Sequence, residues 1–110
     1  NVIRLVEYLY ESGAPASNPM ASLHTDQSFL TMQWFQSHPG LILRDYQGST
    51  VEYYYETGKV ICFFGKKILP AMGNTLQPVE HWVDSSALEN RYAGIFFIHT
   101  AHPSIEMDKY

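Results

Sequence analysis

Short apolar stretches alternate with clusters of glycine, proline, asparagine and serine along most of the chain. The stretches are rich in β-branched and aromatic residues, and none keeps a helical period over three turns. Such runs, separated by turn residues at intervals of roughly 8–12 residues, predict antiparallel strands. The expected strands cover residues 1–10, 21–25, 28–36, 41–46, 50–56, 59–65, 78–84 and 91–100, with a short strand or turn at 66–74.

Many short strands without a long helix favour a mainly β fold, that is, a sandwich, jelly roll or barrel. The 110 residues fit one domain, and we treat 1–110 as a single core. Residues 1–10 already have the pattern of a strand, and the first residue is Asn1 rather than Met. We therefore expect a carboxy-terminal part of a longer chain, with an amino-terminal segment missing.

Composition excludes several classes of function. The net charge is −4 and the longest basic cluster is Lys66-Lys67, so we expect no nucleic-acid partner. The longest nearly uncharged apolar run, "VICFFG", is too short to cross a membrane, and no secretory signal is present. The single cysteine, Cys62, excludes an internal disulfide and indicates a reducing, cytoplasmic compartment. Within its apolar run, Cys62 is expected to be a buried packing residue.

Three residues suggest a metal site. Residues i and i+2 of a strand face the same side, so His24 and Asp26 in "SLHTDQ" can point into one cavity. The simpler interpretation is that they are polar residues at a turn. The next histidine on an expected strand is His81 in "VEHWVD". Two imidazoles and one carboxylate with open positions form the facial triad of non-haem Fe(II) oxygenases.

An arginine follows in an apolar context. Arg91 opens the stretch "RYAGIFFIHT". A buried guanidinium is costly unless an anion pairs with it, and its planar fork suits a carboxylate. The alternatives are an ion pair with Glu89 or Asp84, or simple solvation.

These stretches together resemble the carboxy-terminal core of 2-oxoglutarate/Fe(II)-dependent dioxygenases, in the branch with isopenicillin N synthase, anthocyanidin synthase and the gibberellin oxidases. The similar segments, between about Arg4 and Pro103, are "HTDQSFLTMQWFQSHPGLIL", "GKVICFFGKKILPAMGN", "PVEHWV" and "RYAGIFFIHTAHP". The resemblance implies a double-stranded β-helix, which is a cupin-like jelly roll. It also implies that His24, Asp26 and His81 bind Fe(II).

By the same resemblance, Arg91 holds the distal carboxylate of the co-substrate 2-oxoglutarate. Tyr8 stands where the family often has a tyrosine that contacts this co-substrate, and Tyr10 is its rival. The implied enzyme couples decarboxylation of 2-oxoglutarate, with O₂, to hydroxylation or desaturation of a small organic substrate. The cavity walls are expected to come from these residues or their strand neighbours: Phe29, Met32, Trp34, Ile61, Phe63 and Phe97.

Two departures from the family pattern stand out. The family's arginine is usually followed two residues later by a serine whose hydroxyl also contacts the co-substrate, and this chain has Ala93 there. Lys66 stands where the family usually has Asp after Gly65, which we expect to affect only the local turn. Ala93 mildly favours one alternative, an oxidase like isopenicillin N synthase that does not use 2-oxoglutarate. A second alternative is a non-catalytic jelly-roll binding module, against which the intact triad argues.

Overall fold

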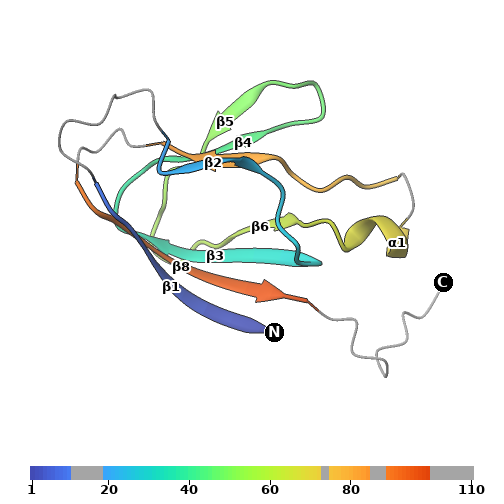
Figure 1. Ribbon diagram of the computed structural model, residues 1–110, viewed down its shortest axis with the longest axis horizontal. Coiled ribbons are helices and arrows are strands. Elements are labelled where there is room, and N and C mark those ends of the chain that lie inside the picture. Colours follow the sequence, from blue (N-terminus) through green and yellow to red (C-terminus); the bar gives the residue numbers. More distant parts are fainter. Residues whose placement is uncertain (11–18, 73–74, 85–88, 100–110) are drawn as a thin grey trace.

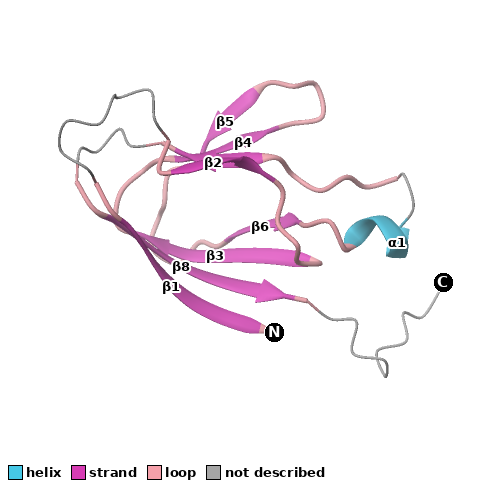
Figure 2. Ribbon diagram, in the orientation of Figure 1, coloured by secondary structure: helices cyan, strands magenta, loops and turns pink. Residues whose placement is uncertain are grey.

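The structure is a computed structural model that describes residues 1–10, 19–72, 75–84 and 89–99. Within these residues, eight strands and one short helix follow one another. Figure 2 colours the strands magenta and the helix cyan. In chain order they are β1 (Val2–Tyr8), β2 (Ala21–His24), β3 (Leu30–Gln36), β4 (Leu41–Arg44), β5 (Thr50–Glu52), β6 (Ile61–Phe64), α1 (Ile68–Met72), β7 (His81–Val83) and β8 (Arg91–Ile98).

The strands form two four-stranded sheets that lie one above the other (Figure 1). The major sheet has the order β1-β8-β3-β6, and the minor sheet has the order β2-β7-β4-β5. All the observed pairs are antiparallel, and the first strands pair with the last, β1 with β8 and β2 with β7. Apart from the β4–β5 hairpin, consecutive strands enter opposite sheets, which is the winding of a double-stranded β-helix. The predicted jelly roll is confirmed.

The core lies between the two sheets. Leu41 and Val83 come from the minor sheet and Phe63 from the major sheet, and all three are less than 9% exposed. The inner face of β3 is polar instead, because Thr31 and Gln33 are 2% and 4% exposed. Buried polar groups of this kind need hydrogen-bond partners, and those partners form part of the candidate site.

An irregularity in β3 brings a third polar side chain inside. The register of β3 against β8 shifts between Gln33 and Phe35, so Gln33 and Gln36 are both 4% exposed. Trp34, between them, lies on the outer face over Gly94, where an added Cβ would come within 2.5 Å of the indole ring. An extra residue in one strand of a pair shifts the alternation of faces after it, which is the effect of a β-bulge.

Three local expectations need correction. Residues 68–72 form the short helix α1 where a short strand or turn was expected, because the chain winds into a turn at Gly65, whose carbonyl oxygen accepts a hydrogen bond from the amide of Ile68. The strand expected at 50–56 is confined to Thr50–Glu52. Cys62 is exposed rather than buried, because its neighbour Phe63 takes the inner face of β6.

The outer face of β1 is apolar and open to solvent. Ile3 and Leu5 are 71% and 80% exposed, and Leu9, just beyond the strand, is 67% exposed. Exposed apolar side chains that lie near one another suit an interaction face. No helix among the described residues has the length and apolarity to cross a membrane.

Candidate metal and anion site

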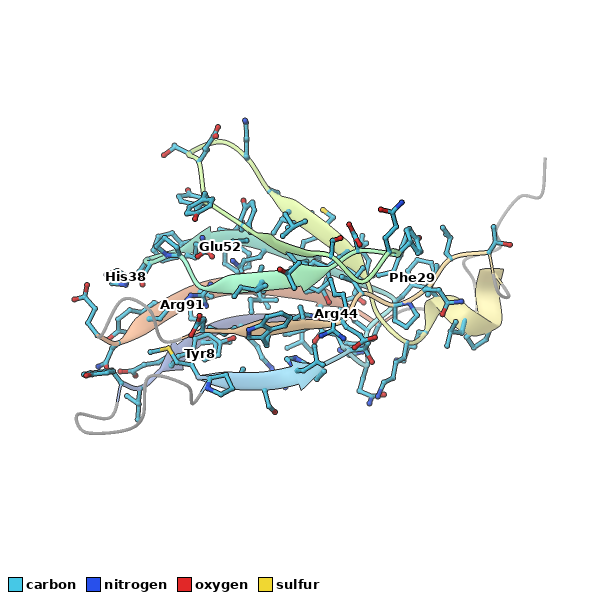
Figure 3. The ribbon with its side chains drawn as sticks, turned by 90° about the horizontal axis from the view of Figure 1, so that it is seen from above. Tyr8, Phe29, His38, Arg44, Glu52 and Arg91 are labelled. Atoms are coloured by element: carbon cyan, nitrogen blue, oxygen red, sulfur yellow. The ribbon has the colours of Figure 1, made fainter. Side chains whose placement is uncertain are left out.

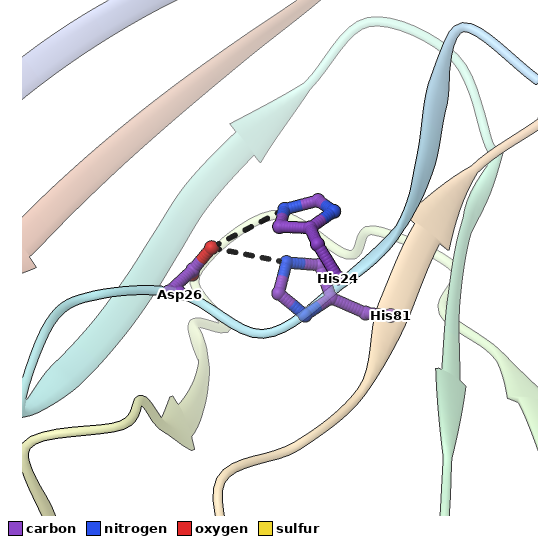
Figure 4. Close-up of side chains that lie close together, drawn as sticks. All are labelled: His24, Asp26 and His81. Carbon is purple, nitrogen blue, oxygen red and sulfur yellow. Dashed lines mark ion pairs between the residues drawn. The ribbon is translucent and has the colours of Figure 1, made fainter.

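His24, Asp26 and His81 come together at one end of the sandwich (Figure 4). One potential ligand atom from each lies within 4.8 Å of the others. Oδ1 of Asp26 is 3.4 Å from Nε2 of His24 and 3.3 Å from Nε2 of His81. The side chains of Asp26 and His81 are 10% and 6% exposed, whereas that of His24 is 44% exposed. The group is therefore anchored in the core and open to solvent on the His24 side.

The strand pairing explains how residues so distant in sequence meet. β2 ends at His24 and β7 begins at His81, and the two residues are direct partners in the minor sheet. Asp26 lies in the loop after β2, where its carbonyl oxygen accepts a 2.8 Å hydrogen bond from the amide of Lys66. Because the backbone of Lys66 makes this contact, the residue type at position 66 is not critical for it. Gly65 permits the close approach, since a Cβ there would lie 2.1 Å from the Ser28 carbonyl oxygen.

The hydrogen bonds of the two imidazoles fix their orientation. Nδ1 of His24 is 2.6 Å from the Ser22 carbonyl oxygen, and Nδ1 of His81 is 3.0 Å from the Val79 carbonyl oxygen. A carbonyl only accepts, so each Nδ1 carries the proton and donates it. In this tautomer the lone pair of Nε2 faces Asp26. Metal-binding histidines usually make such a hydrogen bond through the ring nitrogen that does not bind the metal, which here is Nδ1.

The carboxylate is held in a matching way. Oδ2 of Asp26 accepts a 2.6 Å hydrogen bond from the Thr31 hydroxyl, whose oxygen is 2.7 Å from that of Ser28. Oδ1 is left facing the imidazoles. Burial favours a higher pKa for Asp26, but a hydrogen bond from His81 in its protonated form, the hydrogen bond from Thr31 and the charges of the two histidines when protonated outweigh it, so the pKa is lowered. The carboxylate is thus ionised, and three lone-pair-bearing atoms converge where a proton or a cation stabilises them.

Arg91 lies at the other end of the sandwich, at the start of β8. It is 1% exposed, and Nε donates to the His38 carbonyl oxygen at 3.1 Å. Nη2 donates to Oε1 of Gln36 at 2.7 Å. Nη1 is buried without a hydrogen-bond partner among the described residues. The expected alternative of a pair with Glu89 is wrong, since Glu89 instead pairs with Nε2 of His38.

Tyr8 contacts this arginine directly, as its position beside Arg91 in Figure 3 shows. The two residues are register partners in the major sheet, and Cζ of Arg91 lies 5.2 Å from the centre of the Tyr8 ring. Burial raises the pKa of the Tyr8 hydroxyl, and the Arg91 charge opposes the rise. Burial also lowers the pKa of Arg91, which Tyr8 opposes. Tyr10 lies beyond the end of β1, and its amide donates to Asn90, so the geometry favours Tyr8 over Tyr10.

A cavity of about 60 Å³ lies between the sheets beside the His-Asp-His group. It is large enough for a few water molecules. On β3 its walls come from Thr31 and Gln33, whereas the expected Met32 and Trp34 do not line it. Phe63 and Phe97 do line it as expected, and Phe29 and Ile61 do not. The lining residues are Tyr8, His24, Asp26, Thr31, Gln33, Leu41, Phe63, His81, Val83, Ile95 and Phe97.

A larger cavity of about 720 Å³ lies on the other side of Phe63, between the β4–β5 hairpin, β6 and residues 77–80. Its walls are mostly apolar, with Leu43, Val51 and Phe64 among them. The charged residues at its rim are engaged locally. Arg44 pairs with Glu80 at 3.4 Å and lies over the Trp82 ring, and the Asp45 carboxylate accepts hydrogen bonds from its own turn.

Comparisons with known proteins agree with this architecture. No family model and no curated protein matches the chain. Among solved structures, the rice dioxygenase for auxin oxidation is 23% identical with a TM-score of 0.81, over 92% of this chain and 35% of that one. The Arabidopsis thaliana dioxygenase for auxin oxidation 1, in a 2-oxoglutarate complex, is 20% identical with a TM-score of 0.81, over 93% and 39%. A full-length Neurospora crassa protein in complex with alpha-KG is 19% identical with a TM-score of 0.78, over 91% and 33%.

These likenesses show the fold. The predicted fold is confirmed by this likeness to dioxygenase structures, while membership of the 2-oxoglutarate/Fe(II) dioxygenase superfamily and of its isopenicillin N synthase-like branch stays a prediction. The chain spans between 33% and 39% of the three structures it is compared with. The activity, substrates and partners of the whole protein are therefore matters for proposal.

The polar contacts around the candidate site were not predicted from the sequence. Thr31 and Gln33 alternate with apolar residues in β3, which was a signal for an inward polar pair. Gln36 carried no such signal, because only the bulge after Gln33 turns it inward.

Proposed function

We propose that this chain is the catalytic core of a non-haem Fe(II) oxygenase that uses 2-oxoglutarate. One observation carries the proposal: the described residues place three converging ligand atoms and a buried guanidinium with an unpartnered Nη1 inside the same β-sandwich. A divalent metal satisfies the first group, and a carboxylate satisfies the second. A 2-oxo diacid supplies both a metal-chelating end and a distal carboxylate.

The residues present fit an iron ion. His24 and His81 offer neutral Nε2 atoms and Asp26 offers one carboxylate oxygen, which is the donor set of the facial triad. When bound, the metal supplies activation of O₂ coupled to oxidation of the co-substrate. Thr31 holds the second carboxylate oxygen of Asp26, and the backbone carbonyls of Ser22 and Val79 keep the imidazole protons away from the centre.

Arg91 and Tyr8 would bind the distal carboxylate of 2-oxoglutarate. Nη1 of Arg91 has a hydrogen to donate, and the Tyr8 hydroxyl is kept protonated by its raised pKa. The cavity of about 60 Å³ is smaller than a five-carbon diacid, so binding requires lining side chains to move outward. Tyr8 lines the cavity and also touches the guanidinium, so its movement would connect the two.

The larger cavity is our proposed site for the organic substrate. Its volume, about 720 Å³, lies in the range of ordinary ligand pockets. Its rim charges are paired with each other or with backbone, so its walls favour a neutral, largely apolar molecule. Phe63 lines both cavities and packs against His81 at 4.7 Å between ring centres. It would therefore lie between the substrate and the metal.

Two further expectations belong to this proposal. The exposed outer face of β1, with Ile3 and Leu5, suits coverage by a segment outside residues 1–110. The single Cys62 suits a reducing, cytoplasmic compartment.

Metal analysis followed by succinate measurement separates the proposal from its rivals. The full chain, incubated with Fe(II), 2-oxoglutarate and O₂, is expected to hold one metal per chain and to release succinate. An oxidase like isopenicillin N synthase would hold the metal without releasing succinate. A non-catalytic binding module would show neither property.

A further inference from the structure

Gln36 is the side chain that positions Arg91. The register of the major sheet pairs Gln36 with Ala93, and Arg91 lies two residues before Ala93 on the same face of β8. Nη2 of Arg91 donates to Oε1 of Gln36 at 2.7 Å, the shortest of its observed hydrogen bonds. Because Ala93 has only a methyl group, the longer amide reaches across the space opposite it to the guanidinium.

The orientation of the Gln36 amide is fixed on both sides. Its oxygen also accepts from Nε2 of Gln33 at 3.1 Å, and its nitrogen donates to the Tyr53 carbonyl oxygen at 3.1 Å. If the amide were flipped, its NH₂ group would face the donors of Arg91 and Gln33, and its oxygen would face the Tyr53 carbonyl oxygen. Gln33 in turn lines the metal cavity. A continuous chain of hydrogen bonds therefore runs from the cavity through Gln33 and Gln36 to Arg91.

The charge of this chain matters as much as its geometry. The observed acceptors of Arg91 are an amide oxygen and a backbone carbonyl oxygen, both of them neutral. Neutral acceptors orient a buried guanidinium without cancelling its charge, so the low-polarity surroundings still favour an incoming anion. A carboxylate at the position of Gln36 would form the ion pair internally and remove that attraction.

We propose that Gln36 is a specificity-determining residue, whose neutrality reserves the charge of Arg91 for the distal carboxylate of a 2-oxo diacid. Gln36 is a positioning residue, because it acts through Arg91 and not on the reacting atoms. The inference rests on the proposed function, and it assigns the selection of a diacid over a monoacid to one glutamine. Gln36 also supplies a polar group opposite Ala93, the position at which this chain has no hydroxyl.

The test compares two ligands that differ only in the distal carboxylate. Binding of 2-oxoglutarate and of 2-oxobutyrate to the Mn(II)-loaded full chain is measured by calorimetry. The wild-type protein is expected to prefer 2-oxoglutarate by at least about tenfold, as a charge-assisted contact implies. Gln36→Glu should reduce this preference to about threefold or less while Mn(II) binding is retained, because Arg91 is already neutralised. Gln36→Met keeps the length and the neutrality of the side chain but removes the amide that orients Arg91. It should therefore leave an intermediate preference.

The controls separate the possible failures. Gln47→Glu adds the same charge on the exposed β4–β5 turn and should leave the preference unchanged. A purely structural role of Gln36 would weaken both ligands equally, and an unchanged ratio in Gln36→Glu would overturn the inference. If Gln36→Glu fails to fold, an unchanged ratio in Gln36→Met overturns it instead. A wild-type protein that binds neither acid, or does not prefer the diacid, would contradict the proposed function itself.

Discussion

At one end of the sandwich, a carboxylate and two imidazoles turn their lone pairs toward one point, whereas at the other end a guanidinium lies among neutral acceptors. Asp26 lies 3.3–3.4 Å from both imidazoles, and Arg91 has an unpartnered Nη1. The first end suits a cation, and the second suits an anion. Joining the ends directly would neutralise both, and the fold keeps them apart. The difference indicates a site built for two ligands of opposite charge.

The largest expected effect comes from removing a ligand of the first end. Asp26→Ala and His81→Ala should each abolish binding of a divalent metal, since the facial triad has only three protein ligands. His24→Ala should do the same. His99→Ala, at a histidine outside the group, is the matched control and should bind one metal per chain. Full metal occupancy in His81→Ala, measured by elemental analysis, would show that the ligand set is misassigned.

The next effect concerns the second end alone. Arg91→Ala should raise the apparent dissociation constant of 2-oxoglutarate at least about tenfold, because a charge-assisted bidentate contact is lost. Metal binding should survive, since Arg91 is not a ligand. Arg91→Lys keeps charge without the planar fork and should give an intermediate constant. Equal affinity in wild type and Arg91→Ala, measured by calorimetry, would remove Arg91 from the site.

A smaller effect tests how the carboxylate is supported. Thr31→Val removes the hydroxyl that donates to Oδ2 of Asp26 and keeps the shape of the side chain. Loss of such an outer contact should weaken metal affinity by about tenfold. Ser28→Ala should cost less, because Ser28 reaches Asp26 only through Thr31. Competition with a chelator of known affinity measures the metal affinity of both variants. A larger loss of affinity in Ser28→Ala than in Thr31→Val would contradict the assignment of Thr31 as the direct support of Asp26.

Ala93→Ser probes the departure from the family pattern. The position is fully buried beside Gln36, and a hydroxyl there has the amide and the incoming carboxylate as partners. One added hydrogen bond should tighten 2-oxoglutarate binding about twofold to tenfold. Ala93→Val, which adds bulk without a hydroxyl, is the control and should not tighten it. Weaker binding in Ala93→Ser by titration would show that Gln36 leaves no room for the hydroxyl.

The smallest effect appears at high pH. The pKa of Tyr8 is raised in the folded state, so its contribution to stability is complete below the unfolded-state value of about 10 and is lost as pH rises through the higher folded-state value. Tyr8→Phe should therefore lose stability less steeply above about pH 10 than the wild type. Tyr46→Phe, at a ring that is 77% exposed, is the control. The free energy of unfolding is measured by urea unfolding at a series of pH values. The same loss of free energy per pH unit in Tyr8→Phe and the wild type would contradict the burial of the Tyr8 hydroxyl.

The strands and the triad were accessible from sequence for physical reasons. Period-two alternation marks a strand wherever one face is buried, and it predicted that His24 and Asp26 share a side. The two residues do come together, although Asp26 lies in the loop after β2 and not in the strand. His81 added weight through its place in a late strand, and the resemblance supplied the winding that makes it the partner of His24. The grouping of His24, Asp26 and His81 thus follows from local pattern plus topology.

The environment of Arg91 was not accessible in this way. The bulge after Gln33 is a local change in backbone register that residue composition does not predict. It alone brings Gln36 to the arginine. Cys62 was misplaced for a related reason, because an apolar run on an edge strand does not show which residue faces inward. Helix α1 was missed because five residues are too few to show a helical period.

The most direct test of the two-ended site is an anaerobic titration of 2-oxoglutarate into the Fe(II)-loaded full chain. The measurement follows the metal-to-ligand absorption band of the chelate. The account predicts a saturable band in the wild type, a curve shifted to higher concentration in Arg91→Ala, and no band in His81→Ala. A wild-type protein that holds iron and shows no band at millimolar 2-oxoglutarate would contradict it.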